Sequence, residues 1–234
     1  YFGQDNTFGY HLVNLAVHFI TAFMLFLTIL ALFQSPNLRR KYQGSEYFIA
    51  LLATVLWAIN PIQTQAVTYI VQRMASMAAM FYIAGIYFYL KARLDDSRSA
   101  RILFFLGCCL AFVFALGSKE NAVLLPVSLI LVEFIFFRDL SRPHTRGAFF
   151  AIIAGGVIFI GVVGTLLFIN GNPLGVLNYP HRPFTPLERL LTEPRIVVFY
   201  LSQIFYPAAT RLSIEHDIPI STSIMHPWST IPCL

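Results

Sequence analysis

The sequence predicts an all-α fold, a polytopic transmembrane helical bundle with a further external helix that is either interfacial or re-entrant. Hydrophobic residues make up 57% of the 234 residues, charged residues only 12%, and the mean hydropathy is +0.69. This composition excludes an ordinary water-soluble domain. Long apolar runs alternate with short loops, and ten of the sixteen Lys and Arg residues fall in three loops, at 34–46, 91–101 and 138–147. By the positive-inside rule, these three loops are expected in the cytoplasm.

The first three helices are predicted from the apolar runs of the N-terminal half. Residues 10–33 are uncharged and long enough to cross a hydrocarbon core of ~30 Å. A helix of residues 47–59 would be only ~20 Å long, which is shorter than the hydrocarbon core. To cross the membrane, it must therefore include flanking residues or lie in a thinned bilayer. Pro61 ends it on the external side. A third and longest helix is predicted to begin at residue 63 or 64 and to continue to about residue 93.

The remaining helices follow the same pattern. Residues 102–116 and 121–137 are predicted to form two spans joined by a tight external hairpin. A sixth span is predicted at 148–169, where four glycines favour close packing of a neighbouring helix. Residues 187–206 are amphipathic, and their apolar part is too short to cross the bilayer, so we expect an interfacial or re-entrant helix there. Residues 207–234 are then external as well.

Polar residues inside apolar helices are the first candidates for function. His11, Asn14 and His18 are spaced i, i+3 and i+7, which places them on one helix face. This face is expected either to form interhelical hydrogen bonds or to face a ligand. Neither the histidines nor the three cysteines have the spacing of a metal site, and no basic helix with interleaved aromatics indicates nucleic-acid binding.

Charged residues on the external side form the second set of candidates. Arg73 is predicted to lie two to three turns inside the third helix, where an unpaired cation costs ~3 kcal/mol. Lys119 and Glu120 occupy the predicted hairpin, and Glu120 also favours the dipole at the start of the fifth helix. We expect His11, Arg73, Lys119, Glu120 and Arg195 to converge on the external leaflet and bind a phosphate.

Two further groups of polar residues have simpler interpretations. Glu133 and Asp139, next to Arg138, are predicted to be interfacial anchors at the cytoplasmic end. A polar stripe is predicted along the first turns of the third helix, beside Arg73. It consists of Gln65, Thr68, Tyr69, Gln72 and Ser76.

Several segments together resemble a known family. They are FGYHLVNLAVHF, NPIQTQAVTYIVQRMASMAAMFYIAGIYFYLKAR, GSKENAVLLPVSLILVEFIFF and FTPLERLLTEPRIVVFYLSQIFYPAATRLSIEHDIPIST. In this order they resemble the membrane half of bacterial relatives of the transmembrane-and-tetratricopeptide-repeat O-mannosyltransferases. That family combines a multi-span region of the GT-C glycosyltransferase type with a repeat domain. The resemblance implies a GT-C-like fold and transfer of a sugar from a polyprenyl-phosphate donor to a protein acceptor on the external face.

The resemblance also implies where catalytic parts should lie. The catalytic acid of GT-C enzymes lies in the first external loop, and this chain is expected to begin late in that loop, with Asp5 as its only acid. The catalytic residue is therefore expected before Tyr1, and residues 1–234 are predicted to be one partial transmembrane domain. Many relatives have His-Pro and Thr-Glu where this chain has Asn60-Pro61 and Thr64-Gln65. These changes replace two ionisable groups by amides.

Two functions from different classes remain in competition. The first is an integral-membrane glycosyltransferase in the cytoplasmic (inner) membrane, active on the external or periplasmic face. Its expected partners are membrane lipids, the polyprenyl-linked sugar as donor substrate and a protein acceptor, and a divalent metal is left open. The second is a non-catalytic scaffold, or a subunit bound to a partner membrane protein, in which the same polar residues only hold helices together. An acidic pair after a preceding span would favour the enzyme.

The predicted topology can be tested by labelling single cysteines in intact cells. A cysteine introduced by Ser97→Cys in loop 91–101 should resist a membrane-impermeant thiol reagent, and one introduced by Gly117→Cys in loop 117–120 should react. The physical reason is the retention of Lys and Arg on the cytoplasmic side. Reaction of residue 97 from outside would invert the topology.

Overall fold

Helices make up the regular structure of the described residues, as the sequence predicts. The computed structural model describes residues 7–69, 72–139, 141–169, 184–208, 211–212, 216 and 218–233. The chain divides into two compact units, Tyr1–Arg146 and Gly147–Leu234, which are described separately below.

Four helical segments of the first unit are long and apolar enough to cross a membrane, within the part of the chain that the structure describes. They confirm a membrane protein of the polytopic helical type. The fourth is continuous through η3 (Glu120–Leu124), α7 (Leu125–Val132) and the π-helical turn η4 (Glu133–Phe137). The other three are α1 (Phe8–Phe33), α5 (Arg73–Leu94) and α6 (Arg98–Ser118). The tight hairpin predicted at 117–120 is confirmed, since η3 begins two residues after α6 ends.

The second predicted span is a bent element. Helix α3 (Glu46–Ala58) ends before Pro61, and η1 (Pro61–Gln63) leads into the short helix α4 (Thr64–Thr68). The two parts are bent by 51°, which makes them either one broken span or a re-entrant loop. The side chain of Asn60 stabilises the bend, because its oxygen accepts a hydrogen bond of 3.1 Å from the Ile62 N–H.

The prediction of one helix from residue 63 to residue 93 is wrong. Helix α4 ends at Thr68, Tyr69 is extended (φ −90°, ψ 112°), and α5 begins only at Arg73. Arg73 is therefore the first residue of a helix and not deep inside one, and the predicted polar stripe is divided between two helices. The break has a physical cause in side chains that bind the carbonyls of α4. Asn14 donates to Val67 O at 3.2 Å, and Ser76 Oγ lies 3.3 Å from Ala66 O.

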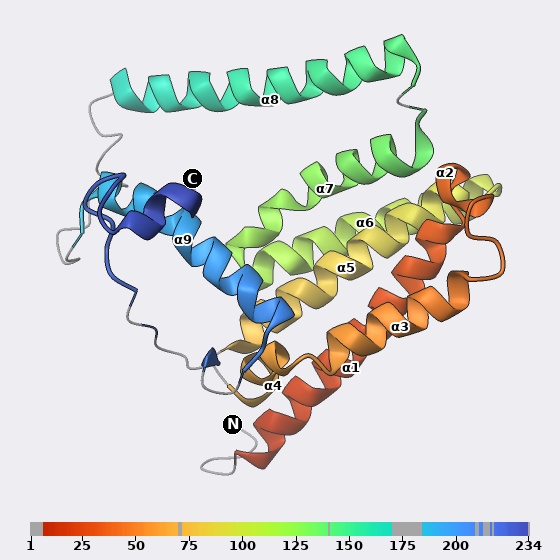
Figure 1. Ribbon diagram of the computed structural model, residues 1–234. Helices are drawn as coiled ribbons and strands as arrows, with labels where there is room; N and C mark the ends of the chain where they lie inside the picture. The colour runs from red at the N-terminus through yellow and green to blue at the C-terminus, as the bar shows by residue number, and fades with distance from the viewer. Residues whose placement is uncertain are drawn as a thin grey trace. The chain divides into compact units, whose positions relative to one another are not determined.

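Small residues allow the helices of the first unit to approach closely. Figure 1 shows α1, α3, α5 and α6 side by side, with α2 (Pro36–Arg39) at one end. A Cβ placed on Gly85 of α5 would lie 2.8 Å from Leu125 Cδ2, which shows how tightly α5 meets α7. Large apolar side chains remain exposed on the outer faces, as expected for helices surrounded by lipid. The buried apolar residues of α5 and α6 are mostly small: Ala78, Ala84, Leu90, Ala92, Cys108, Ala111 and Ala115.

Glu133 is more than the interfacial anchor that the sequence predicts. Its carboxylate accepts two hydrogen bonds from Arg93, at 2.8 and 3.0 Å, and one each from Tyr89 and Arg138, at 2.9 Å. Nearby, Asn37 Nδ2 donates to the carbonyls of residues 135 and 138 at 2.7 and 3.0 Å. These bonds join α2, α5 and the π-helical turn at the end of the bundle predicted to be cytoplasmic. The anchor prediction for Asp139 is untested; that residue pairs with Arg142.

The helices predicted after the fifth span are present. Helix α8 (Pro143–Ile169) begins in the first unit and continues into the second, and its crossing of the membrane stays a prediction. A Cβ placed on Gly155 or Gly156 meets no atom within 4 Å, so close packing is not seen at these two glycines. Gly161 and Gly164 have no described side-chain surroundings, and residues 170–183 lie outside the described residues.

Helix α9 (Pro186–Phe205) confirms the amphipathic helix predicted at 187–206, while its interfacial or re-entrant position is untested. It begins with a capping box, in which Thr185 Oγ1 accepts from the Glu188 N–H and the Glu188 carboxylate accepts from the Thr185 N–H. The Thr185 N–H and the Thr185 hydroxyl both donate to the Glu188 carboxylate, and these bonds to the charged form lower the pKa of Glu188. The described chain ends with η6 (Trp228–Cys233).

The contact between α5 and α7 provides a test of the packing in the first unit. The substitution Gly85→Val should lower the free energy of unfolding by about 1–3 kcal/mol, because its side chain collides with the buried Leu125. The matched control is Gly156→Val, where a Cβ meets open space. Thermal unfolding of both variants in the same detergent is the measurement, and equal transition temperatures would contradict the packing.

Candidate functional site

The start of α5, the start of η3 and the N-terminal half of α1 lie at one end of the first unit. Helices α5 and α6 are antiparallel neighbours, so the start of α5 and the end of α6 share this end of the bundle. Arg73 contacts Tyr10 and Asn14 of α1, and Ala75 lines a cavity together with Lys119. By the predicted topology, this end is external.

Asn14 holds this end together. Its side chain is 1% exposed and joins α1 to two other helices. Its Nδ2 donates to Val67 O of α4 at 3.2 Å, and its Oδ1 accepts from Arg73 Nε of α5 at 3.0 Å. The interhelical role considered for the polar face of α1 is therefore confirmed for Asn14.

Arg73 is held at this position by uncharged groups. Besides Asn14, its guanidinium donates to Tyr10 O at 3.4 Å and lies 5.2 Å from the centre of the Tyr10 ring. All of these groups are formally neutral, and no carboxylate of the described residues pairs with Arg73. A cation held by neutral acceptors remains available to attract an anion.

His18 connects α1 to α3. Its ring stacks on Trp57 with centroids 5.1 Å apart, and its Nε2 lies 3.0 Å from Ala58 O. A carbonyl oxygen can only accept a hydrogen bond, so Nε2 carries the proton in this contact. In the neutral imidazole, Nδ1 is then an acceptor. His18 thus also takes the interhelical role predicted for this face.

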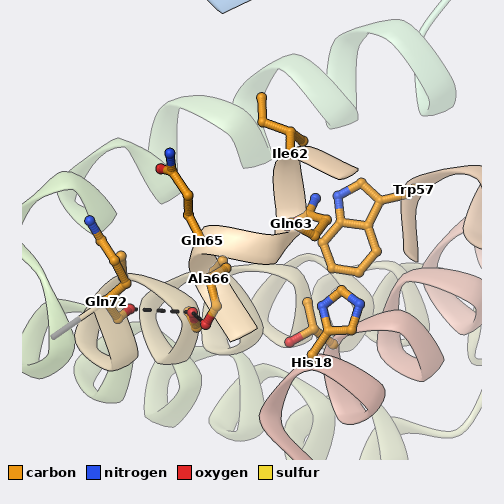
Figure 2. A pocket seen from close by; sticks show the side chains of 11 residues that line it. His18, Trp57, Ile62, Gln63, Gln65, Ala66 and Gln72 are labelled. Carbon is orange, nitrogen blue, oxygen red and sulfur yellow. Dashed lines mark hydrogen bonds between the residues drawn. The ribbon is translucent and has the colours of Figure 1, made fainter. Parts of the chain in front are cut away.

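His18 borders a cavity of about 250 Å³, called the polar cavity below and shown in Figure 2. Figure 2 shows His18, Trp57 and Gln63 close together, with Gln65, Ala66 and Gln72 on the other side of the view. None of the lining residues is Asp, Glu, Lys or Arg. The cavity is lined by His18, Thr21, Trp57, Ile62, Gln63, Gln65, Ala66, Gln72, Ala75, Ser76 and Ala79.

A second cavity of about 390 Å³, called the Lys119 cavity, lies beside the first. The two share Ala75 and Ala79 of α5 as lining residues. Lys119 forms no ion pair within the described part of the chain. The lining of this cavity is apolar apart from three residues, and it consists of Ala75, Ala78, Ala79, Tyr82, Ile83, Lys119, Asn121, Ala122 and Leu124.

Arg73 lines neither of these cavities, and His11, Glu120 and Arg195 are not brought into them either. His11 lines a third, apolar cavity of about 350 Å³ with residues of α1 and α4, which shares no lining residue with the Lys119 cavity. Glu120 is exposed at the first position of η3. Arg195 belongs to the second unit, where its Nη1 donates to Pro219 O at 2.7 Å and to Ser221 Oγ at 3.1 Å.

The sequence did not predict the polar cavity, because its polar residues come from α1, η1, α4 and α5. The predicted polar stripe contained only Gln65, Gln72 and Ser76 of these residues. The sequence also did not predict the role of Glu133, although an acid within an apolar run is itself a signal of a buried partner. Among the described residues, no group of three or more His, Cys, Asp or Glu side chains is placed to hold a metal ion.

The chain is similar to two curated membrane enzymes. Protein O-mannosyl-transferase TMTC2 of Homo sapiens is 28% identical over 211 residues, which cover 85% of this chain and 24% of that protein. Protein O-mannosyl-transferase TMTC3 of Mus musculus is 21% identical over 224 residues, which cover 96% of this chain and 20% of that protein. The chain therefore spans about a quarter or less of these relatives, and the similarity suggests a glycosyltransferase. No family model and no solved structure matches.

The bridging role of Asn14 leads to a stability prediction. The substitution Asn14→Leu leaves Val67 O and Arg73 without their partner and should cost about 1–3 kcal/mol in the free energy of unfolding. Thr28→Val is the control, because the Thr28 hydroxyl bonds only to Met24 O of its own helix. Chemical or thermal unfolding in detergent measures both variants. A loss for Asn14→Leu no larger than that for Thr28→Val would contradict the bridging role.

Proposed function

We propose that this chain is part of an integral-membrane, GT-C-like glycosyltransferase. In this proposal a sugar moves from a polyprenyl-phosphate donor to a protein hydroxyl on the external or periplasmic face of the cytoplasmic membrane. The observation that carries the proposal is the Lys119 cavity, an apolar cavity with one amine, at the same end of the first unit as Arg73, which no described carboxylate neutralises. Apolar walls suit a prenyl chain, and cations suit its phosphate. The similarity to two O-mannosyl-transferases supports the same reaction class.

The charges fit the course of such a reaction. The acceptor oxygen forms a bond to the anomeric carbon while the bond from that carbon to the phosphate oxygen breaks. The electron pair of the broken bond leaves with the lipid phosphate, and the acceptor proton passes to a base. Negative charge on the phosphate therefore grows in the transition state, and fixed cations stabilise this state more than the ground state.

The predicted site residues take different parts in this proposal. Lys119 and Arg73 are assigned to the lipid phosphate, with His11 and Glu120 at the edges of the same external end. Arg195 contributes least, because one of its terminal nitrogens already binds Pro219 and Ser221. No described residue is assigned as the base, and the acceptor reaches the sugar from the external side.

The second candidate is a membrane scaffold or complex subunit with no chemistry of its own. One observation favours it: Asn14 and His18 both bind backbone carbonyls of neighbouring helices, so part of the polar face of α1 serves to hold helices together. The two functions make opposite predictions about sugar transfer.

Transfer of a labelled sugar by the full-length protein distinguishes them. With polyprenyl-phosphate sugars as donors, Lys119→Ala should lower kcat/KM by about 100-fold, the scale for loss of one group that stabilises a developing oxyanion. Arg73→Lys should be impaired less than Arg73→Ala, because it keeps the charge.

The control for this assay is Arg39→Ala, which removes an exposed cation in the loop predicted to be cytoplasmic. It should transfer sugar at the rate of the parent. Absence of transfer with every common lipid-linked sugar, or full activity of Lys119→Ala in folded protein, would favour the scaffold.

A further inference from the structure

The polar cavity has the chemistry of a site for an uncharged, hydroxyl-rich group. We propose that it binds the sugar ring of the donor, while the Lys119 cavity binds the phosphate and the first part of the prenyl chain. This inference rests on the proposed function and adds to it the residues that recognise the sugar: His18, Gln63, Gln65, Gln72 and Ser76.

The lining of the polar cavity matches sugar hydroxyls and does not match phosphate. Each glutamine amide offers both donors and acceptors, as each hydroxyl does, so the two form complementary pairs. The lining carries no Lys or Arg to neutralise a phosphate and no carboxylate to bind a cation. Nε2 of His18 donates to Ala58 O, and the other ring nitrogen of an uncharged imidazole is an acceptor. An uncharged ligand is therefore favoured over an anion.

The size of the polar cavity restricts the ligand further. A cavity of about 250 Å³ has room for one sugar ring.

The polar cavity is built into the fold at the bend between α3 and α4. Non-helical backbone at membrane depth is tolerated where it is buried in protein or lines an aqueous cavity. Here η1 supplies Ile62 and Gln63 to the lining, and the Asn60 side chain and His18 fix the backbone on either side of the bend. Polar bonds thus hold the cavity open before any ligand arrives.

The position of the two cavities fits a donor in which sugar and phosphate are directly linked. Sites for two covalently joined groups must adjoin, and the two cavities share Ala75 and Ala79. Because the side chains of Ala75 and Ala79 are small, few side-chain atoms of α5 separate the two cavities. A ring in the polar cavity would then place its anomeric carbon toward the phosphate at Lys119.

Two cysteine reporters in the full-length protein test this assignment without requiring sugar transfer. Ala66→Cys reports on the polar cavity and Asn121→Cys on the Lys119 cavity. Alkylation by a small maleimide at each position is measured by mass spectrometry, with polyprenyl phosphate or its mannosyl and glucosyl forms as ligands. At ten times the Kd, mass action leaves about one molecule in eleven free, so a protected cysteine should react about tenfold more slowly.

The expected pattern is protection of residue 121 by all three lipids and protection of residue 66 only by a sugar-bearing lipid. Protection of 66 by polyprenyl phosphate alone would overturn the assignment of the polar cavity to sugar. Protection of 121 but never of 66 would also overturn it while leaving the proposed donor class intact. Failure to protect either position would overturn this inference together with the proposed donor.

A matched pair of variants tests the glutamine lining. Gln72→Leu removes one amide and should weaken binding of the preferred sugar-bearing lipid by about 5- to 10-fold, the scale of one hydrogen bond, and leave binding of polyprenyl phosphate unchanged. Gln34→Leu makes the same change at an exposed position after α1 and should alter neither. Equal weakening of both ligands by Gln72→Leu would contradict sugar recognition.

Discussion

The structure depends most on the requirement that polar groups within a bilayer find partners inside the protein. Asn14 shows how this requirement organises the first unit. Its buried amide donates to Val67 O and accepts from Arg73 Nε, so one side chain of α1 fixes both the end of α4 and the beginning of α5. Because lipid offers no alternative partner, separation of these helices leaves the amide and the carbonyl unsatisfied. The end of α4 and the position of Arg73 both follow from this contact.

Hydropathy was sufficient to locate the apolar runs that form the four candidate spans of the first unit, and the hairpin at 117–120, because helix length in a membrane is set by the thickness of the hydrocarbon core. It was insufficient at Tyr69, where the structure leaves the helical conformation. The residues before this break are helix-compatible and include no Pro or Gly. What ends α4 is a contact with Asn14, more than fifty residues earlier in the chain. A local pattern cannot report a non-local partner, so the predicted long helix and the depth of Arg73 were wrong together.

The candidate site could also be predicted only in part from the sequence. Arg73 and Lys119 could be selected because cations near lipid are costly, and the structure leaves both without an ion pair among the described residues. The polar cavity could not be selected, since His18, Gln63 and Gln72 come from three elements whose meeting depends on the bend. Arg195 was selected for its charge alone. Its hydrogen bonds to Pro219 and Ser221 indicate instead a role in holding the chain after α9.

No carboxylate is among the described residues that line the two cavities, which bears on the proposed function. A glutamate at position 65 would place a negative charge in the polar cavity, next to the α5 face that also borders Lys119. At low dielectric, such a charge would pair with the nearest cation and lower the attraction of that cation for phosphate. Gln65 retains hydrogen-bonding capacity without this competition. In the proposed function, neutral amides face the sugar, while Arg73 and Lys119, which have no ion pair among the described residues, face the phosphate.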